Sequence, residues 1–219
     1  MDLAPYIEHT RLRADTTPAD VDALCREAVQ HRFGGVCVNP LFVPHAKRAV
    51  SGSAVRVVTV AGFPLGASHT SIRVAEARRA VEEGADDVDL VLPVGPALAS
   101  DWTYVEDDVR AVREAIPRAT LKVILETGHF DEAGITRATE ICVLAGADFV
   151  KTSTGFGPRG ASVRDVELMI VAAGGRARVK ASGGIKTARE AIELISAGAT
   201  RLGTSSGVSI LLGAAISGR

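Results

Sequence analysis

The sequence predicts an α/β fold, a single-domain (β/α)8 TIM barrel that spans residues 1–219. Short, β-branched apolar runs alternate with amphipathic segments along the chain. Several of these runs are almost continuously hydrophobic, as parallel strands covered on both faces are. The chain has 219 residues, 47% of them hydrophobic, and this length suits one barrel because such barrels run from about 200 residues upward.

Strand and helix signals follow one another in a regular order. Thr17-Pro18 offers a helix N-cap followed by proline, and the segment beginning at Thr187 has the form of a capping box. Glycine suits the left-handed C-cap of a helix, and Gly-Ala pairs end three expected helices: Gly84-Ala85, Gly146-Ala147 and Gly198-Ala199. Eight segments are expected to be strands: residues 6–10, 35–39, 55–63, 86–92, 121–127, 149–154, 178–182 and 201–205.

An open, doubly wound sheet is the alternative fold. Such sheets usually have fewer strands and carry a GxGxxG motif after the first strand. No such motif follows residues 6–10 or 35–39, and the sequence shows neither a linker nor a low-complexity segment. The barrel is therefore the fold that we expect.

Composition narrows the range of partners. The 25 Lys+Arg nearly balance the 26 Asp+Glu, so we expect no nucleic-acid partner. The N-terminus lacks the basic and apolar regions of a signal peptide, and no apolar run approaches the roughly 20 residues that cross a bilayer, so we expect no membrane partner. Cys25, Cys37 and Cys142 form no CxxC pair, which favours a reducing, cytoplasmic location. No histidine shows metal-ligand spacing, so no metal is expected.

Reactive side chains interrupt the apolar strands. In barrels of this kind the active site lies at the C-terminal ends of the strands, and a lone charge in a buried strand costs several kcal/mol unless it is paired or neutralised. One such residue is equally well explained by an internal ion pair, for example Lys122 with Glu126 or Asp89. Five on four strands favour a functional site: Asp89, Lys122, Glu126, Lys151 and Lys180.

Lys151 and Lys180 form the most informative pair, because each follows a valine at the same stage of the sixth and seventh expected strands. Neighbouring strands lie roughly 4.8 Å apart, so we expect the ammonium groups within roughly 5–7 Å of each other. At an effective dielectric constant of about 20, two unit charges at this range repel by about 2–3 kcal/mol. That repulsion lowers a lysine pKa by roughly 2 units, and desolvation lowers it further. The pair thus predicts a neutral amine that attacks a carbonyl group and forms an imine.

Glycine-rich segments follow the last two expected strands, where barrels often bind phosphate together with the N-terminus of a short extra helix. Glycines let backbone N–H groups approach an anion, and serine hydroxyls and a lysine add donors. A short apolar segment, residues 208–216, follows the second of these loops. We expect these residues to bind phosphate, the first of them from the neighbouring loop: Gly155, Gly183, Gly184, Lys186, Gly203, Ser205 and Ser206.

Seven motifs resemble the signatures of deoxyribose-phosphate aldolases. They follow one another in order, and the resemblance extends from about residue 6 to residue 211. The two lysine motifs are the most specific. The motifs are IEHT at 7–10, VCVNP at 36–40, GFPLG at 62–66, DVDLV at 87–91, LKVI at 121–124, KTSTGF at 151–156 and VKASGGI at 179–185.

The resemblance implies reversible cleavage of 2-deoxy-D-ribose 5-phosphate to acetaldehyde and D-glyceraldehyde 3-phosphate, a step of deoxyribonucleoside catabolism. Lys151 matches the Schiff-base lysine of the family, and Lys180 matches the second lysine, which perturbs the first. Asp89 matches the acid/base carboxylate, and Lys122 matches a lysine that lines the same site. The family implies no metal, no organic cofactor, small sugar phosphates and aldehydes as partners, and a homodimer or homotetramer.

The sequence departs from the family pattern at several positions. Glu8 stands where the family often has Asp, Pro93 where it often has Asn, and Lys186 where it often has Arg. Lys186 keeps the positive charge but loses the forked donor geometry of arginine. Some members carry a tyrosine in a C-terminal tail, whereas this chain ends in Ser217-Gly218-Arg219, so the resemblance does not extend to a tail-assisted proton transfer.

Two alternative functions remain open from the residues alone. One is another imine-forming barrel aldolase that acts on a different sugar phosphate. The other is a non-catalytic phosphate-binding barrel, in which replacing Lys151 would leave function intact.

Overall fold

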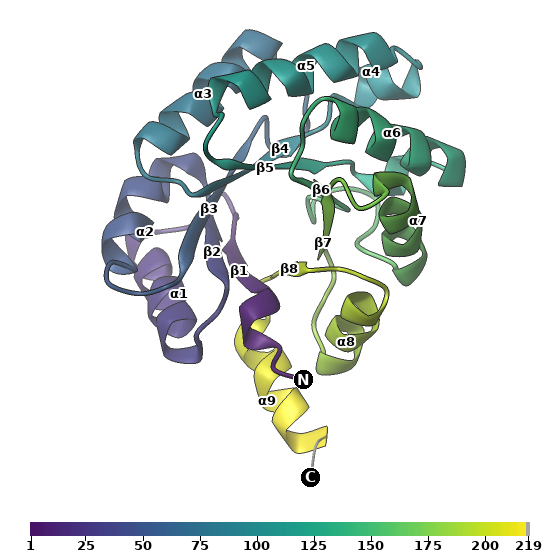
Figure 1. Ribbon diagram of the computed structural model, residues 1–219. Coiled ribbons are helices and arrows are strands. Elements are labelled where there is room, and N and C mark those ends of the chain that lie inside the picture. Colours follow the sequence, from purple (N-terminus) through teal and green to yellow (C-terminus); the bar gives the residue numbers. More distant parts are fainter. Residues whose placement is uncertain (218–219) are drawn as a thin grey trace.

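Eight parallel strands close into a barrel in the order of the sequence, each paired with the next and β8 with β1 (Figure 1). The computed structural model describes residues 1–217. The expected (β/α)8 barrel is confirmed, because every one of the eight expected segments overlaps a strand. The strands are β1 Ile7–Arg11, β2 Gly35–Val38, β3 Arg56–Ala61, β4 Asp87–Val91, β5 Thr120–Ile124, β6 Phe149–Lys151, β7 Arg178–Ser182 and β8 Arg201–Thr204.

Two strands end three residues before the position that the sequence indicated, the largest differences among the eight. β5 stops at Ile124 rather than at residue 127, and β6 stops at Lys151 rather than at residue 154. Glu126 adopts the left-handed conformation, with φ 56°, which no regular strand accommodates. The residues that follow both strands, 125–127 and 152–154, remain buried because the chain enters the mouth of the barrel there.

Helices cover the outside of the barrel (Figure 1). Thr17 and Thr187 form the expected N-caps, and each completes a capping box. Gly84, Gly146 and Gly198 follow the ends of three helices with φ of 111°, 93° and 113°, as expected for left-handed glycine. The α-helices are α1 Pro18–His31, α2 Val43–Ala49, α3 Thr70–Glu82, α4 Val94–Leu98, α5 Trp102–Ala115, α6 Glu132–Leu144, α7 Val163–Ala173, α8 Ala188–Ser196 and α9 Gly207–Ser217, and the 3-10 helices are η1 Ala4–Tyr6, η2 Pro40–Phe42 and η3 Thr127–His129.

The main apolar core fills the space between the strands and the helices. It takes alternate residues of the strands, such as Val57 and Val150, together with the inner faces of the helices. A second, smaller apolar cluster is separate from this core and contains Leu12, Cys37, Val58 and Val60, with Phe63 packed against it. The barrel interior therefore holds an apolar cluster in addition to the charged residues described below.

The described part of the chain contains no helix with both the length and the apolar character that a bilayer crossing requires. Gly218 and Arg219, which include the end of the C-terminal segment discussed above, lie outside the described residues.

Candidate active site

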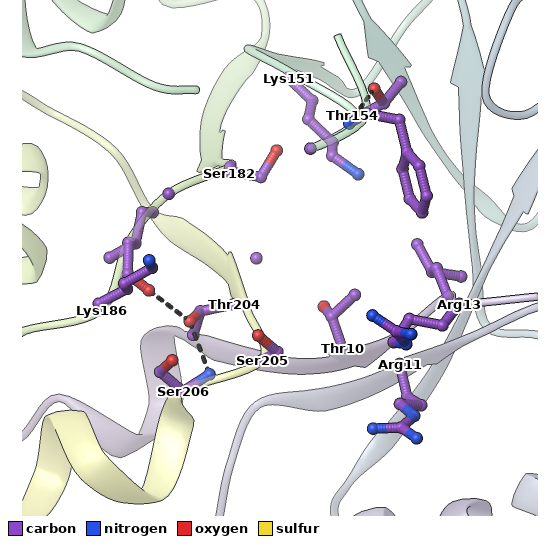
Figure 2. A pocket seen from close by; sticks show the side chains of 17 residues that line it. Thr10, Arg11, Arg13, Lys151, Thr154, Ser182, Lys186, Thr204, Ser205 and Ser206 are labelled. Carbon is purple, nitrogen blue, oxygen red and sulfur yellow. Dashed lines mark hydrogen bonds between the residues drawn. The ribbon is translucent and has the colours of Figure 1, made fainter. Parts of the chain in front are cut away.

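Lys151 ends β6 and lines a cavity of about 420 Å³ at the mouth of the barrel. Figure 2 shows its amine pointing into this cavity. The side chain is almost fully buried, and Nζ donates a hydrogen bond to Asp89 Oδ2 at 2.8 Å. A primary amine thus lies where a bound molecule would reach it, held by a single carboxylate among the described residues.

Lys180 is the register partner of Lys151 on the neighbouring strand β7. Its Nζ donates to the same Asp89 Oδ2 at 2.6 Å and also contacts Glu8. Since both nitrogens contact one oxygen atom, they can be separated by no more than the sum of the two contact distances. The structure therefore brings the two lysines together as their register predicted, and it adds a shared carboxylate that the sequence argument did not place between them.

The two lysines differ in the direction of their pKa shifts. Burial, reinforced by the positive charge of Lys180, lowers the pKa of Lys151 against the opposing effect of Asp89. Burial also acts to lower the pKa of Lys180, but Asp89 and Glu8 outweigh it and raise that pKa above its ordinary value. The pKa of Lys151 is lowered in the expected direction and by both expected causes, of which burial is larger than the repulsion between the two lysines because the barrel interior excludes water.

Lys122 lies deeper in the same cluster and is fully buried. Its Nζ lies 2.7 Å from Asp87, 3.1 Å from Asp89 and 3.3 Å from Glu8. Burial acts to lower the pKa of Lys122, but these carboxylates raise it overall. Burial acts to raise the pKa of Asp89, yet Lys122, Lys151 and Lys180 hold it well below its usual range. Asp89 is therefore a carboxylate in contact with three lysines.

Glu126 belongs to a different part of the site. It lies in the loop after β5 and accepts hydrogen bonds from the backbone N of Thr154, at 3.3 and 3.2 Å, and from the Thr154 hydroxyl. The ion pair between Lys122 and Glu126 that the sequence allowed is absent from the described residues, and the pair between Lys122 and Asp89 is present. Glu126 therefore fixes the loop after β6, which forms one wall of the cavity.

The seven residues expected to bind phosphate all line the same cavity as Lys151. Six of them come from the loops after β6, β7 and β8, and Gly203 lies within β8 itself. Figure 2 shows Lys186, Ser205 and Ser206 on one side of the cavity. Gly155, Gly183 and Gly184 have φ of 88°, 89° and 78°. The first turn of α9 follows directly after Ser206, and helix N-termini are a common position for anion sites in proteins.

Sequence reasoning missed the wall formed by the end of β1 and the loop that follows it. Thr10, Arg11, Leu12 and Arg13 line the cavity (Figure 2). The rule that places active sites at the C-terminal ends of barrel strands applies to β1 as well and would have found them. Phe156 was also missed as a lining residue, and its ring meets that of Phe63 edge-on with centroids 5.4 Å apart.

His9 and Cys37 both have structural surroundings. His9 Nε2 lies 2.7 Å from Glu27, and its ring packs on Phe33. Cys37 is fully buried in β2, where burial raises the pKa of its thiol to about 11. No group of three or more histidine, cysteine or carboxylate side chains within residues 1–217 is arranged to hold a metal ion.

A (β/α)8 barrel that buries a lysine of lowered pKa beside a cavity rimmed by glycine loops has the architecture of a lysine-dependent aldolase. The chain belongs to the DeoC/LacD family of aldolases, whose family model matches residues 4–214.

Known proteins resemble the chain along nearly its whole length. It is 54% identical over 213 residues to the deoxyribose-phosphate aldolase of Deinococcus radiodurans, covering 97% of each chain. It is 51% identical over 213 residues to that of Thermus thermophilus, again covering 97% of each chain. The solved structure of the Aeropyrum pernix deoxyribose phosphate aldolase, described as a unique tetramer, matches with a TM-score of 0.88 at 33% identity, covering 96% of this chain and 89% of that chain. The resemblance stated from the motifs is thereby confirmed.

Proposed function

We propose that this protein is a deoxyribose-phosphate aldolase that cleaves 2-deoxy-D-ribose 5-phosphate reversibly to acetaldehyde and D-glyceraldehyde 3-phosphate. The observation that carries the proposal is the buried amine of Lys151, which faces a cavity rimmed by glycine loops and whose pKa is lowered. Relatives at about half identity carry that activity in their names.

The reaction begins when the neutral amine of Lys151 attacks C1 of the open-chain aldehyde. With a proton from Lys180, the adduct loses water to give a protonated imine, which withdraws electrons from the bond between C2 and C3. The C3 hydroxyl loses its proton as this bond breaks, and glyceraldehyde 3-phosphate leaves. The enamine that stays on Lys151 takes a proton at C2, and water then releases acetaldehyde.

Proton transfer is assigned to Asp89 and Lys180, the buried groups next to Lys151. Asp89 contacts both lysines through one oxygen, so it can pass protons between the reacting atoms and a water molecule, with Lys180 as the neighbouring acid. Lys122 contacts the second oxygen of Asp89 at 3.1 Å and keeps that carboxylate ionised. These assignments explain why three lysines converge on one aspartate.

The substrate phosphate is assigned to the rim of the cavity, where backbone N–H groups, hydroxyls and one lysine gather near the start of α9. Holding the phosphate there would fix the aldehyde end of the chain over Lys151. The residues assigned to the phosphate are Gly155, Gly183, Gly184, Lys186, Gly203, Ser205 and Ser206.

We further assign the protein to the cytoplasm and to a homodimer or homotetramer. A related aldolase of solved structure is described as a tetramer, which supports assembly of copies of the chain.

The decisive experiment is treatment with acetaldehyde and borohydride, followed by peptide mass mapping. The expected result is a reduced two-carbon adduct on Lys151 in an enzyme that turns over deoxyribose 5-phosphate. Lys151→Ala should lose both adduct and turnover, whereas Lys47→Ala, at an exposed lysine paired with Asp86, should keep both. Turnover without an adduct would refute the imine mechanism. Preferred cleavage of a keto-sugar phosphate would indicate a different aldolase, and an intact function in Lys151→Ala would indicate a non-catalytic barrel.

A further inference from the structure

Lys151 and Lys180 share one carboxylate but differ in a second. Both amines contact Asp89 Oδ2. Lys180 also contacts Glu8, whereas within residues 1–217 Lys151 has no ion pair other than that with Asp89. Glu8 is therefore the carboxylate that distinguishes two otherwise similar neighbours.

Glu8 is placed for this effect by the closure of the barrel. It lies in β1, 172 residues from Lys180 in sequence, and is fully buried. The barrel places β8 between β1 and β7, and Glu8 reaches across Gly203, its register partner on β8. A methyl group on Gly203 would come within 3.1 Å of Lys180 Cε, so this glycine leaves the space through which the two side chains meet.

The charges around Glu8 and Lys151 come from several strands. Lys122 of β5 lies 3.3 Å from Glu8, and the thiol of Cys37 on β2 interacts with Lys151. Burial raises the pKa of that thiol to about 11, so it is uncharged near neutral pH. Two arginines add positive charge to the cluster: Arg56, which contacts Asp87, and Arg201, which lies 3.6 Å from Glu8. These cations balance the negative charge of the carboxylates, so an additional positive charge on Lys151 is not needed for neutrality.

Burial penalises an ammonium ion on either lysine, and proximity penalises two at once. If Asp89 were the only carboxylate near the two amines, a single proton would be found on either lysine with similar probability. A second carboxylate at one amine breaks the symmetry, because an opposite charge within about 4 Å favours the protonated form.

We infer that Glu8 is a positioning residue that decides which lysine reacts: it holds the ammonium ion on Lys180 and so leaves Lys151 as the free amine. This inference rests on the proposed function, because it assumes that Lys151 is the Schiff-base lysine. Glu8 acts through Lys180 and does not line the substrate cavity.

The test compares Glu8→Gln, which removes the charge, with Glu8→Asp, which retains it. The measurement is kcat/KM for deoxyribose 5-phosphate cleavage across pH. In Glu8→Gln the proton spends more time on Lys151. The acid limb of the profile, where kcat/KM falls as the pH falls, should therefore move to higher pH by at least about one unit, with about a tenfold loss of kcat/KM on that limb. Activity should recover at pH values above the shifted limb. Glu8→Asp should keep the acid limb within a few tenths of a unit of the parent.

A purely structural role would lower kcat/KM equally at every pH, and that result, or an unmoved limb, would overturn the inference. Lys180→Met provides a second measurement, because without Lys180 there is no competitor for the proton. Adding Glu8→Gln to Lys180→Met should then shift the acid limb much less than Glu8→Gln does alone. Equal shifts in the two backgrounds would contradict the inference. If the parent enzyme itself forms no adduct on Lys151, the proposed function fails; if it does and the Glu8 variants behave like the parent, only this inference fails.

Discussion

The interior of the barrel has two unlike halves. β2 and β3 contribute Cys37, Val58 and Val60 to an apolar cluster, whereas β1, β4, β5, β6 and β7 contribute the lysines and carboxylates of the charged cluster. The halves meet directly, since Val60 is the register partner of Asp89.

The apolar half bears no reactive group, but it influences the pKa of Lys151. Burial is the leading cause of the lowered pKa of Lys151, and the apolar side chains help to maintain that burial by excluding water. The charges of the charged half determine which group is protonated, and the exclusion of water by the apolar half strengthens the effect of those charges. Substitutions in the two halves should therefore differ in size and in pH dependence.

The largest effect is expected for Asp89→Asn. This change leaves three buried lysines without their common carboxylate, so the free energy of unfolding should fall by about 3–5 kcal/mol. Loss of the group to which we assign proton transfer should lower kcat by about 10²- to 10⁴-fold. Denaturant unfolding and steady-state kinetics measure the two effects. Asp107→Asn, at an exposed aspartate, should change stability by less than about 0.5 kcal/mol, and an equal loss in both variants would contradict the role of the cluster.

The second prediction concerns pH. Protonated Lys151 is not a nucleophile, so activity should fall as the pH falls through the pKa of Lys151, by about tenfold per unit well below it. Because burial lowers this pKa from its ordinary value of 10.5, the acid limb should lie below pH 10.5. A profile of kcat/KM against pH measures its position. A limb at or above the ordinary value would show that the barrel interior does not shift this amine.

Much of this arrangement was predictable from local patterns, and the remainder depends on closure of the barrel. Eight strands, the capping box at Thr187 and the N-cap at Thr17 follow from periodicity and cap residues, and the pairing of Lys151 with Lys180 follows from strand register. The contact of Glu8 with Lys180 does not, because it joins residues 172 positions apart through the tilt and closure of the sheet. The leading role of burial also escapes the sequence, since the exclusion of water depends on the packed barrel. One signal was available: Glu8 is a carboxylate between Ile7 and His9 in a strand that alternates its faces.

Introducing a polar group into the apolar half should weaken the contrast between the halves. Val60→Thr places a hydroxyl beside Asp89, which should favour the charged form of Lys151 and move the acid limb upward, with a loss of about three- to tenfold on that limb. Val57→Thr is the matched control, because Val57 lies on the same strand but belongs to the outer core. Both variants should lose some stability, but only Val60→Thr should move the limb. A shift of the same size in Val57→Thr would mean that polarity inside the barrel is not the cause.

The rim of the cavity should respond through binding rather than through proton transfer. A methyl group on Gly160 would lie 2.2 Å from the carbonyl oxygen of Gly183, so Gly160→Ala must displace the loop assigned to phosphate. We expect KM for deoxyribose 5-phosphate to rise by about tenfold, as a lost charge-assisted hydrogen bond would cause. Trapping of acetaldehyde on Lys151 should change little, because acetaldehyde carries no phosphate. Gly95→Ala, where the added methyl meets nothing within 4 Å, should leave both values unchanged, and a parallel loss of trapping in Gly160→Ala would indicate a general distortion.

The smallest effect is expected at Lys186, whose side chain lies exposed on the rim. An exposed charge contributes little because water screens it, so Lys186→Ala should raise KM by only about two- to fivefold, and less at high salt. Lys186→Arg keeps the charge and adds a forked donor that suits a phosphate, so its KM should equal or fall below that of the parent. Steady-state kinetics at low and high ionic strength measure both variants. A change in kcat or in the acid limb on replacing Lys186 would contradict the comparison, because it would place a rim residue within the proton-transfer chemistry of the barrel interior.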